Sequence, residues 1–346
     1  MTCDPLNHRE RRVLAAVIQT YVETAEPAGS RTLSRRYQLG VSPATIRNTM
    51  SDLEDKGYLF HPHTSAGRVP TDVAYRVYVN ELMQVGPVEQ EARVRLLGEL
   101  AGGGNAIETI LRRAAQMLGV LTHELGVALG PSIEELVLER LELLQVSSER
   151  LLMVLRLRGG AAHTIFVEAP ARVADVALTA VTLVLNERLA GLTLREIRAT
   201  LPERLRDTVA PEEAQELLNI FIQEGEQLFD VPGSMGQNVL LGQTSVLVEQ
   251  PEFADSDSMR QLLAITDRPQ ALGELLRRQR GPTACSISIG RENPDPTLSR
   301  FTVVTAEYRM GELAGVIGVI GPTRMPYDKV VSLVTHTSRL ITELLD

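Results

Sequence analysis

The chain has 346 residues, of which 44% are hydrophobic and only 4% aromatic, and its formal net charge is −9. This length is enough for two or three domains, and so few aromatic side chains argue against a protein that stacks single-stranded bases on aromatic platforms. Two cysteines, Cys3 and Cys285, are too few for a disulfide framework or a cysteine zinc site. No apolar run reaches the roughly 18 residues of a membrane span, and the first residues lack the apolar core of a signal peptide. We therefore expect a cytoplasmic protein that does not bind membranes.

Charge is distributed unevenly along the chain. Residues 1–80 contain ten basic and eight acidic residues, whereas the remainder contains 25 basic and 36 acidic residues. A mildly basic N-terminal segment on an acidic body is typical of a protein whose N-terminal part meets a phosphate backbone.

The first forty residues predict two helices. Asn7 followed by Glu10 is a capping-box pattern, and apolar residues then recur on one helical face. Ser30 is expected to cap a short second helix that carries Tyr37 inward and ends at Gly40.

A third helix follows with strong boundary signals. Ser42 is a good N-cap, Pro43 suits the first helical position, and Gly57 suits the C-terminal end. The inward positions of this helix, spaced as i, i+4 and i+7, are Ile46, Met50 and Leu53.

The outward face of the third helix suits a DNA major groove. Asn48 can pair with adenine, Arg47 with guanine or phosphate, and the methyl groups of Thr45 and Thr49 with thymine. Two short helices joined by a tight turn, the second polar at its leading end, predict a helix-turn-helix.

A β-hairpin is predicted directly after this helix. Residues 59–61 and 68–69 read as two strands around a loop, which makes a wing, and Arg68, His61 and His63 are placed to contact phosphates or the minor groove. Nothing nearby completes a metal site around the two histidines, so we expect no metal.

The predicted DNA contacts come from the second helix, the third helix and the wing. A helix-turn-helix also occurs in purely structural units, but the wing and the basic balance favour DNA binding. The residues predicted to bind DNA are Arg31, Thr32, Arg35, Ser42, Thr45, Arg47, Asn48, His61, His63, Ser65 and Arg68.

The rest of the chain mixes helices and strands, as in an α+β body. Arg76, in the helix after the wing, is expected to be solvated. The predicted helices are 71–83, 88–100, 106–129, 173–190, 211–229 and 326–345, and the predicted strands are 285–289, 301–308 and 313–320 in one sheet, with further β structure over 136–167.

No catalytic constellation is evident, so we expect a protein that is not an enzyme and holds no cofactor. Gly315, Gly318 and Gly321 imitate a glycine-rich loop, but they lie in an apolar strand without a following Lys-Ser/Thr, which favours close strand packing. His163 and His336 have no evident nucleophile with an acidic partner.

Six segments of the chain carry a recognisable pattern, and they are 26–33, 42–48, 62–71, 185–191, 289–293 and 315–327. Together they resemble the HrcA family of bacterial heat-inducible transcription repressors. Most of the chain matches in the same order, although 158–163 departs from the family pattern. The helix-turn-helix alone would also fit sugar-responsive repressors of the DeoR type.

The resemblance implies a multi-domain α+β protein with an N-terminal winged helix-turn-helix and a GAF-like α+β body into which a smaller dimerisation domain is inserted. The approximate boundaries are 1–85 for the winged helix, 86–105 for a linker helix and hinge, 106–145 with 235–346 for the GAF-like domain, and 146–234 for the insertion.

The resemblance also implies partners and a regulated function. A homodimer would bind double-stranded DNA at the CIRCE inverted-repeat operator of chaperonin and DnaK-type operons, repress transcription there, and lose activity on heat stress. The GroE chaperonin would modulate the active fold. The alternatives are a metabolite-responsive winged-helix repressor of the DeoR type with a ligand in the central domain and, with least support, an enzyme with a DNA-binding head.

Overall fold

The computed structural model divides into two compact units. One comprises Met1–Leu129, Val239–Tyr308 and Val316–Leu345, and the other comprises Gly130–Asn238 and Arg309–Gly315, which we call the insertion. The residues that the structure describes are 6–62, 67–101, 107–131, 133–158, 162–169, 172–208, 211–229, 239–254, 256–279, 284–311 and 313–345.

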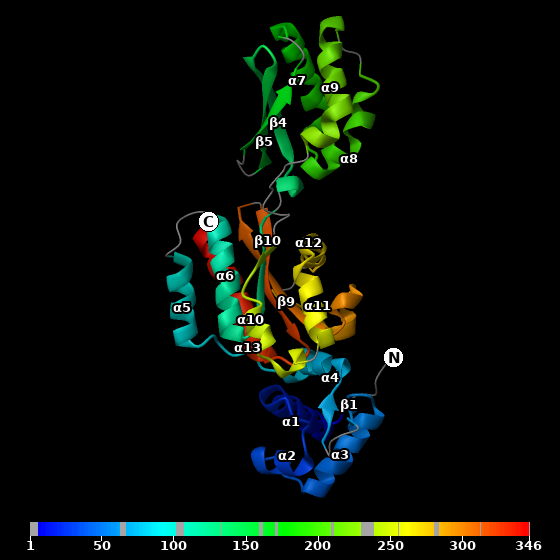
Figure 1. Ribbon diagram of the computed structural model, residues 1–346, viewed down its shortest axis with the longest axis vertical. Helices are drawn as coiled ribbons and strands as arrows, with labels where there is room; N and C mark the ends of the chain where they lie inside the picture. The colour runs from blue at the N-terminus through cyan, green and yellow to red at the C-terminus, as the bar shows by residue number, and fades with distance from the viewer. Residues whose placement is uncertain are drawn as a thin grey trace. The chain divides into compact units, whose positions relative to one another are not determined.

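Residues 6–83, which we call the head, form a winged helix-turn-helix, as predicted. Figure 1 shows its helices grouped at the blue end of the chain beside a two-stranded antiparallel hairpin. The elements of the head are α1 (His8–Thr24), α2 (Ser30–Arg36), α3 (Pro43–Asp55), β1 (Leu59–Phe60), β2 (Val69–Pro70), α4 (Asp72–Val77) and the π-helical turn η1 (Tyr78–Leu82).

The helix boundaries confirm one predicted cap and correct another. At α1 the capping box forms, because the Glu10 N–H donates to Asn7 Oδ1 and the Asn7 N–H donates to Glu10 Oε2, both at 2.9 Å. Ser30 was predicted to cap α2 but is its first helical residue, since the extended Gly29 takes the cap position. The helix then ends before Gly40, because Tyr37 leaves helical geometry with φ −117° and ψ 133°.

A five-stranded sheet forms the centre of the body, the part of the first unit outside the head. Its order is β7-β3-β10-β9-β8, and the three C-terminal strands share one sheet, as predicted. The strands are β3 (Leu125–Leu129), β7 (Val239–Leu241), β8 (Ser286–Ile289), β9 (Phe301–Met310) and β10 (Leu313–Pro322).

The prediction of a single helix over 106–129 is wrong in its last third. The helix α6 (Ile107–Thr122) ends there, His123 adopts a left-handed φ of 60°, and the chain continues as β3. All five residues of β3 are buried, so this strand shows the continuous apolar run of a buried strand. Such a run cannot be distinguished from a buried helical segment by its periodicity.

Helices cover both faces of the body sheet, as expected of a GAF-like layered body (Figure 1). Gly126 of β3 lies so close to α6 that a Cβ there would be 1.8 Å from the carbonyl oxygen of Ala115. The covering helices are α5 (Gln90–Ala101), α6 and α13 (Tyr327–Leu345) on one side, and α10 (Ser245–Val248), α11 (Ser256–Thr266) and α12 (Pro269–Arg278) on the other.

The segment predicted as a linker helix is a packed layer of the body. Leu96 and Leu100 of α5 are buried, and α5 lies against α6 and α13. Gly318 lies within β10, directly over Val304 of β9, which confirms strand packing as the role of this glycine.

The insertion is a three-stranded antiparallel sheet with helices on one face. A boundary at 146 would cut its first strand, whereas the compact unit starts at Gly130. The helix α8 was not predicted, although Thr193 and Glu196 form a capping box at its start. The elements of the insertion are β4 (Leu138–Ser147), β5 (Arg150–Leu157), β6 (Ala162–Glu168), α7 (Asp175–Leu189), α8 (Leu194–Leu205) and α9 (Glu212–Leu228).

Asn186 of α7 closes one edge of the insertion's sheet. Its side chain accepts from the Leu141 N–H at 2.8 Å and donates to the Leu141 carbonyl oxygen at 2.7 Å. At Leu141, the backbone N–H and C=O on the edge of β4 therefore bond to a side chain, where a neighbouring strand would otherwise pair. Among the described residues, no helix has the length and apolar character needed to cross a membrane.

We predict that Gly126→Ala lowers the free energy of unfolding by about 1–3 kcal/mol, because the added methyl group would force α6 away from β3. The matched control is Gly98→Ala on α5, where a Cβ meets open space. Alanine there should stabilise the helix by up to about 1 kcal/mol. Chemical denaturation of both variants measures the difference, and equal effects would contradict the close packing of α6 on β3.

Candidate nucleic-acid interface

The helix α3 is held at its start by the residue predicted to cap it. Ser42 Oγ accepts from the Thr45 N–H at 3.1 Å and lies 3.0 Å from Thr45 Oγ1, and Pro43 occupies the first turn. The Ser42 hydroxyl therefore has a structural bond in the free protein, at the leading end of α3.

Two of the predicted base-reading residues of α3 are exposed and one outward assignment is wrong. Arg47 and Asn48 are exposed, and Thr45 is half-buried. Thr49, predicted to face outward, is only 1% exposed, and its hydroxyl donates to the Thr45 carbonyl oxygen at 3.1 Å. Its position three residues after Ile46 places it on the inner face of the helix.

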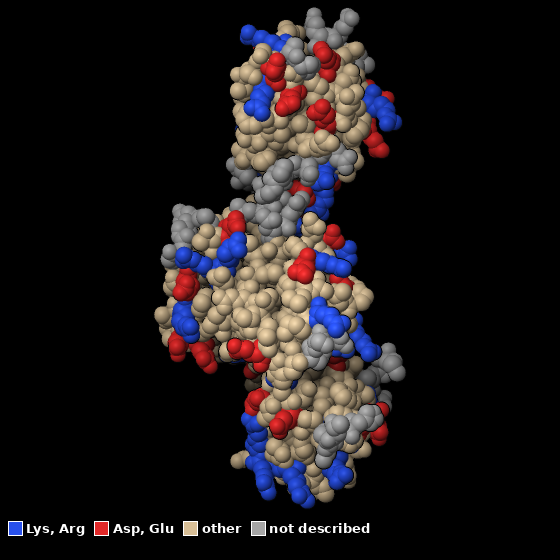
Figure 2. Space-filling view, in the orientation of Figure 1, with Lys and Arg blue, Asp and Glu red and all other residues tan. Residues whose placement is uncertain are grey.

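A basic surface covers α2 and the leading end of α3. Arg31, Thr32 and Arg35 of α2 are exposed. Within the described part of the chain, no carboxylate lies within ion-pair distance of Arg31, Arg35 or Arg47. Figure 2 shows Lys and Arg gathered at this end of the head. Uncompensated guanidinium groups on one face provide the electrostatic attraction that binding to a phosphate backbone requires.

The wing residues have partners inside the head. Arg68 Nε lies 2.7 Å from Glu54 Oε2, and the Arg68 side chain is only 20% exposed. Its backbone N–H and C=O bond to those of Ala28, so Arg68 fastens the hairpin to the turn before α2 and to the end of α3. His61 Nδ1 lies 3.0 Å from the Gly67 carbonyl oxygen. The predicted contacts His63 and Ser65 lie outside the described residues.

A buried ion pair, which the sequence did not reveal, joins the first and third helices. Lys56 Nζ donates to Glu10 Oε1 at 2.9 Å and to Oε2 at 3.0 Å. Burial acts to raise the pKa of the Glu10 carboxyl, but the bonds from Lys56 and from the Asn7 N–H outweigh it and leave that pKa below its ordinary value. Glu10 is therefore both the capping-box residue of α1 and the anchor for the end of α3.

Catalytic chemistry finds no support in the described residues. Burial raises the pKa of the Cys285 thiol to about 12, so it stays protonated at neutral pH and is a poor nucleophile. Burial disfavours the charged form of the histidines too, and it therefore lowers the pKa of His163 and of His336. Across the described ranges, no three His, Cys, Asp or Glu side chains converge as metal ligands would.

Comparison with known proteins places the chain in a family. The family model described as "HrcA protein C terminal domain" matches residues 108–331. A protein of Chlorobium phaeobacteroides named heat-inducible transcription repressor HrcA is 40% identical over 96% of this chain and 96% of its own length. This chain belongs to the HrcA family. A repressor of the same name from Geobacter sulfurreducens is 36% identical to it over 99% of this chain and 98% of that protein.

The fold of this HrcA-family chain also has a solved counterpart. A crystal structure of a hypothetical protein at 2.2 Å resolution superposes with a TM-score of 0.58 and covers 99% of each chain at 23% identity. The likeness confirms the arrangement of the fold. The family identifies the chain as a transcription regulator, with the winged helix as the element suited to DNA.

We predict that Glu10→Gln lowers the free energy of unfolding at pH 7 by about 1–3 kcal/mol, because it removes the charge that Lys56 and the capping box hold. A carboxyl whose folded pKa is lowered adds stability above its unfolded pKa of about 4.3, and that stability disappears as the pH falls through the folded pKa. The difference between the proteins should therefore shrink as the pH is lowered below about 4. Denaturation at a series of pH values tests this, and a constant difference would contradict the charge-based role.

Proposed function

We propose that this HrcA-family chain is a homodimeric, sequence-specific repressor that reads one half-site of an inverted repeat with each head. The observation that carries the proposal is the exposed face of α2 and α3, where Arg31, Arg35 and Arg47 have no carboxylate within ion-pair distance among the described residues and Asn48 follows Arg47. Matching a two-fold symmetric protein to a two-fold symmetric operator lets both recognition helices enter the major groove at once.

The residues of the head divide into two roles. Arg47 and Asn48 are placed to read base edges, with Thr45 beside them, since arginine and asparagine make bidentate contacts with guanine and adenine. Arg31 and Arg35, with Thr32, are placed for phosphates. Ser42, His61 and Arg68 act first through the bonds that shape α3 and the wing.

The relatives' names support a heat-responsive repressor. The operator is the CIRCE repeat in front of chaperonin and DnaK-type operons, the GroE chaperonin maintains the active fold, and heat lowers the active pool when misfolded proteins occupy that chaperonin. Full operator affinity that survives heating without chaperonin would overturn this mechanism. The near full-length match to these relatives favours it over the DeoR-type alternative.

An uncovered apolar face of the insertion supports the dimer. The β4-β5-β6 sheet packs one face on α7, α8 and α9, and its other face is open in this chain. Leu144, Leu152 and Phe166 stand opposite one another across the three strands on that open face, and Leu144 and Phe166 are 50% and 58% exposed. Exposed apolar rows of this kind mark interaction sites.

The helix α7 carries exposed apolar side chains as well. It is bonded to the edge of β4 through Asn186, and its outward Val176 and Leu183 are 67% and 69% exposed. A helix that is apolar on both sides is normally covered on both sides. We therefore assign this combined surface of sheet and helix to contact with a second copy of the chain.

We predict that Arg47→Ala and Asn48→Ala each weaken binding to the inverted-repeat duplex by about 1–3 kcal/mol, while binding to a scrambled duplex changes little for Asn48→Ala. Fluorescence anisotropy at two salt concentrations measures both affinities, and specific binding should exceed nonspecific binding by about 10³ or more.

The control for these variants is Arg112→Glu, which changes a charge of the body on α6, away from the head. It should leave the preference for the operator intact. Equal binding of both duplexes by the unaltered protein, with and without added chaperonin, would overturn the proposed function.

We also predict that Phe166→Asp separates the dimer, because a carboxylate would then be buried within the apolar face of the insertion. The dissociation constant of the dimer should rise by about tenfold or more. Val94→Asp on α5 is the control, since Val94 is 61% exposed outside the insertion. Sedimentation velocity over a concentration series distinguishes the two, and an unchanged dimer in Phe166→Asp would exclude this surface.

A further inference from the structure

Two arginines tie the head to the body. Arg76 of α4, which the sequence predicted to be solvated, donates from Nε to Glu292 Oε1 at 2.8 Å and from Nη2 to the Ile287 carbonyl oxygen at 2.7 Å. Its Nη2 also pairs with Glu292 Oε2, so the guanidinium grips the carboxylate with two nitrogens. The arginine belongs to the head, and Glu292 and Ile287 belong to the body, while its Nη1 also donates to Asn80 Oδ1 of the head at 3.4 Å.

The second arginine belongs to the body and donates to the head. Arg324 follows β10 in the body, and its Nη1 donates to the Val22 carbonyl oxygen near the end of α1 at 2.7 Å. Its Nη2 donates to Glu252 Oε2 at 2.9 Å, and its Nε pairs with the other oxygen of that carboxylate. Two-point arginine–carboxylate pairs fix direction as well as distance, because both groups are planar.

A third polar contact requires a glycine. The Asp72 carboxylate at the start of α4 accepts from the Arg291 N–H at 3.3 Å. The preceding Gly290 has a φ of +54°, and a Cβ there would lie 2.2 Å from that carboxylate. Segment 289–293, which carried part of the family resemblance, therefore forms the surface of the body that contacts the start of α4.

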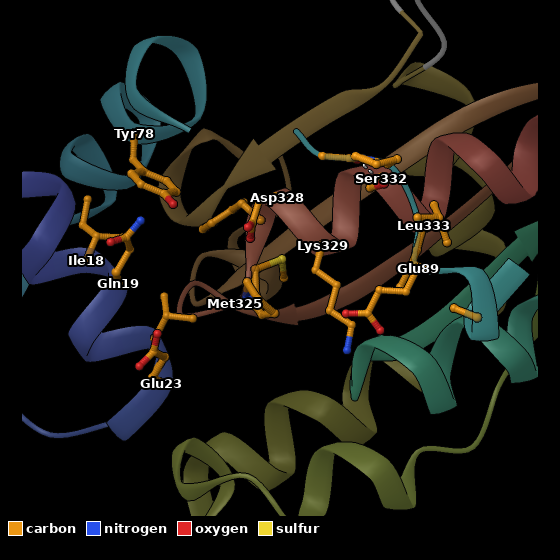
Figure 3. Close-up of a pocket in the computed structure, with 17 residues that line it drawn as sticks. Ile18, Gln19, Glu23, Tyr78, Glu89, Met325, Asp328, Lys329, Ser332 and Leu333 are labelled. Carbon is orange, nitrogen blue, oxygen red and sulfur yellow. Dashed lines mark hydrogen bonds between the residues drawn. The ribbon is translucent and has the colours of Figure 1, made fainter. Parts of the chain in front are cut away.

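Two pockets flank the contact between the head and the body. On one side of the junction lies a cavity of about 440 Å3, across which Gln19 and Tyr78 of the head face Met325 and Asp328 of the body (Figure 3). On the other side, a cavity of about 690 Å3 extends beneath the hairpin.

A single aromatic contact stands between the two cavities. Tyr327 lines the first cavity and Tyr75 the second, and their rings pack with centroids 5.6 Å apart. Both rings are 1% exposed. A ring pair has less directional preference than a two-point arginine–carboxylate pair, so we infer that the polar bonds define the angle of the head.

We propose that Arg76 and Arg324 are positioning residues for DNA recognition. They fix the angle of the head on the body and thereby the separation of the two recognition helices in the dimer. The inference rests on the proposed function, since it concerns how a dimer selects the spacing of an inverted repeat. A looser junction leaves each head able to read its half-site. It removes the fixed separation of the two heads, so repeats with different spacings bind with more similar affinity.

The experiment compares three labelled duplexes by fluorescence anisotropy: a single half-site, the inverted repeat, and the repeat with a spacer lengthened by about 5 bp, half a helical turn. The unaltered protein should bind the lengthened repeat about a hundredfold more weakly than the native repeat. Arg76→Glu, which sets two carboxylates against each other, should reduce that ratio to about tenfold or less, with half-site affinity within about twofold of the original.

A rescue variant and a control complete the set. Adding Glu292→Gln to Arg76→Glu removes the repulsion and supplies an amide donor, while the new side chain can still accept from the Ile289 N–H that Glu292 now holds at 2.9 Å. Spacing selectivity should return in part. Arg112→Glu breaks a pair of the same kind within α6 and should leave selectivity unchanged. If Arg76→Glu does not fold, Glu252→Gln gives the test at the second arginine with nearly the same shape.

The outcomes separate the two claims. Unaltered protein that binds the inverted repeat no better than a scrambled duplex would overturn the proposed function and this inference together. A preserved repeat preference with unchanged spacing selectivity in both Arg76→Glu and Glu252→Gln would overturn the positioning role alone. An equal loss of half-site and repeat affinity would also overturn it, because it would show damage to the head itself.

Discussion

The pairing of β3 with β10 is the constraint on which the body depends. Leu125 to Leu129 align antiparallel with Ile320 to Val316, so the strand before the insertion is joined to a strand from the end of the chain. Nearly all of these residues are fully buried, and on its other side β3 pairs with β7, the strand that follows the insertion in sequence. Because the partners are so distant in sequence, the body cannot form until the C-terminal strands are available, and such long-range pairing folds slowly.

The head depends on contacts that are mostly local in sequence. Its core is local, built from short helices whose caps and inward positions lie close together in sequence, and the Glu10–Lys56 pair closes it. A compact scaffold of this kind leaves the outward face of α2 and α3 free for arginines that have no carboxylate to neutralise them among the described residues. Two other head arginines, Arg68 and Arg76, are less exposed and pair with Glu54 and Glu292, so they act inside the protein.

The division between paired and unpaired arginines connects structure to function. Among the described residues, Arg31, Arg35 and Arg47 have no carboxylate within ion-pair distance, which suits them to phosphates and base edges, whereas Arg68 and Arg76 hold the wing against α3 and the head against the body. The insertion adds an exposed apolar surface of the kind that marks interaction sites. Under the function proposed above, these features together let a dimer select both the bases of each half-site and the distance between half-sites.

The sequence by itself determined the winged helix, most strands of the body and the family, because caps, helical periodicity and punctuation by glycine and proline are local signals. Tertiary structure alone decided the rest. The sequence could not separate β3 from the end of α6, because β3 is buried on both faces and its apolar run carries no periodicity. Thr49 is a separate case, since its spacing from Ile46 already places it on the inner face of α3 and only its polarity suggested an outward position. Arg68 and Arg76 became structural because Glu54 and Glu292 reach them only in the folded chain, and a pairing between residues as distant as Arg76 and Glu292 leaves no local pattern in the sequence.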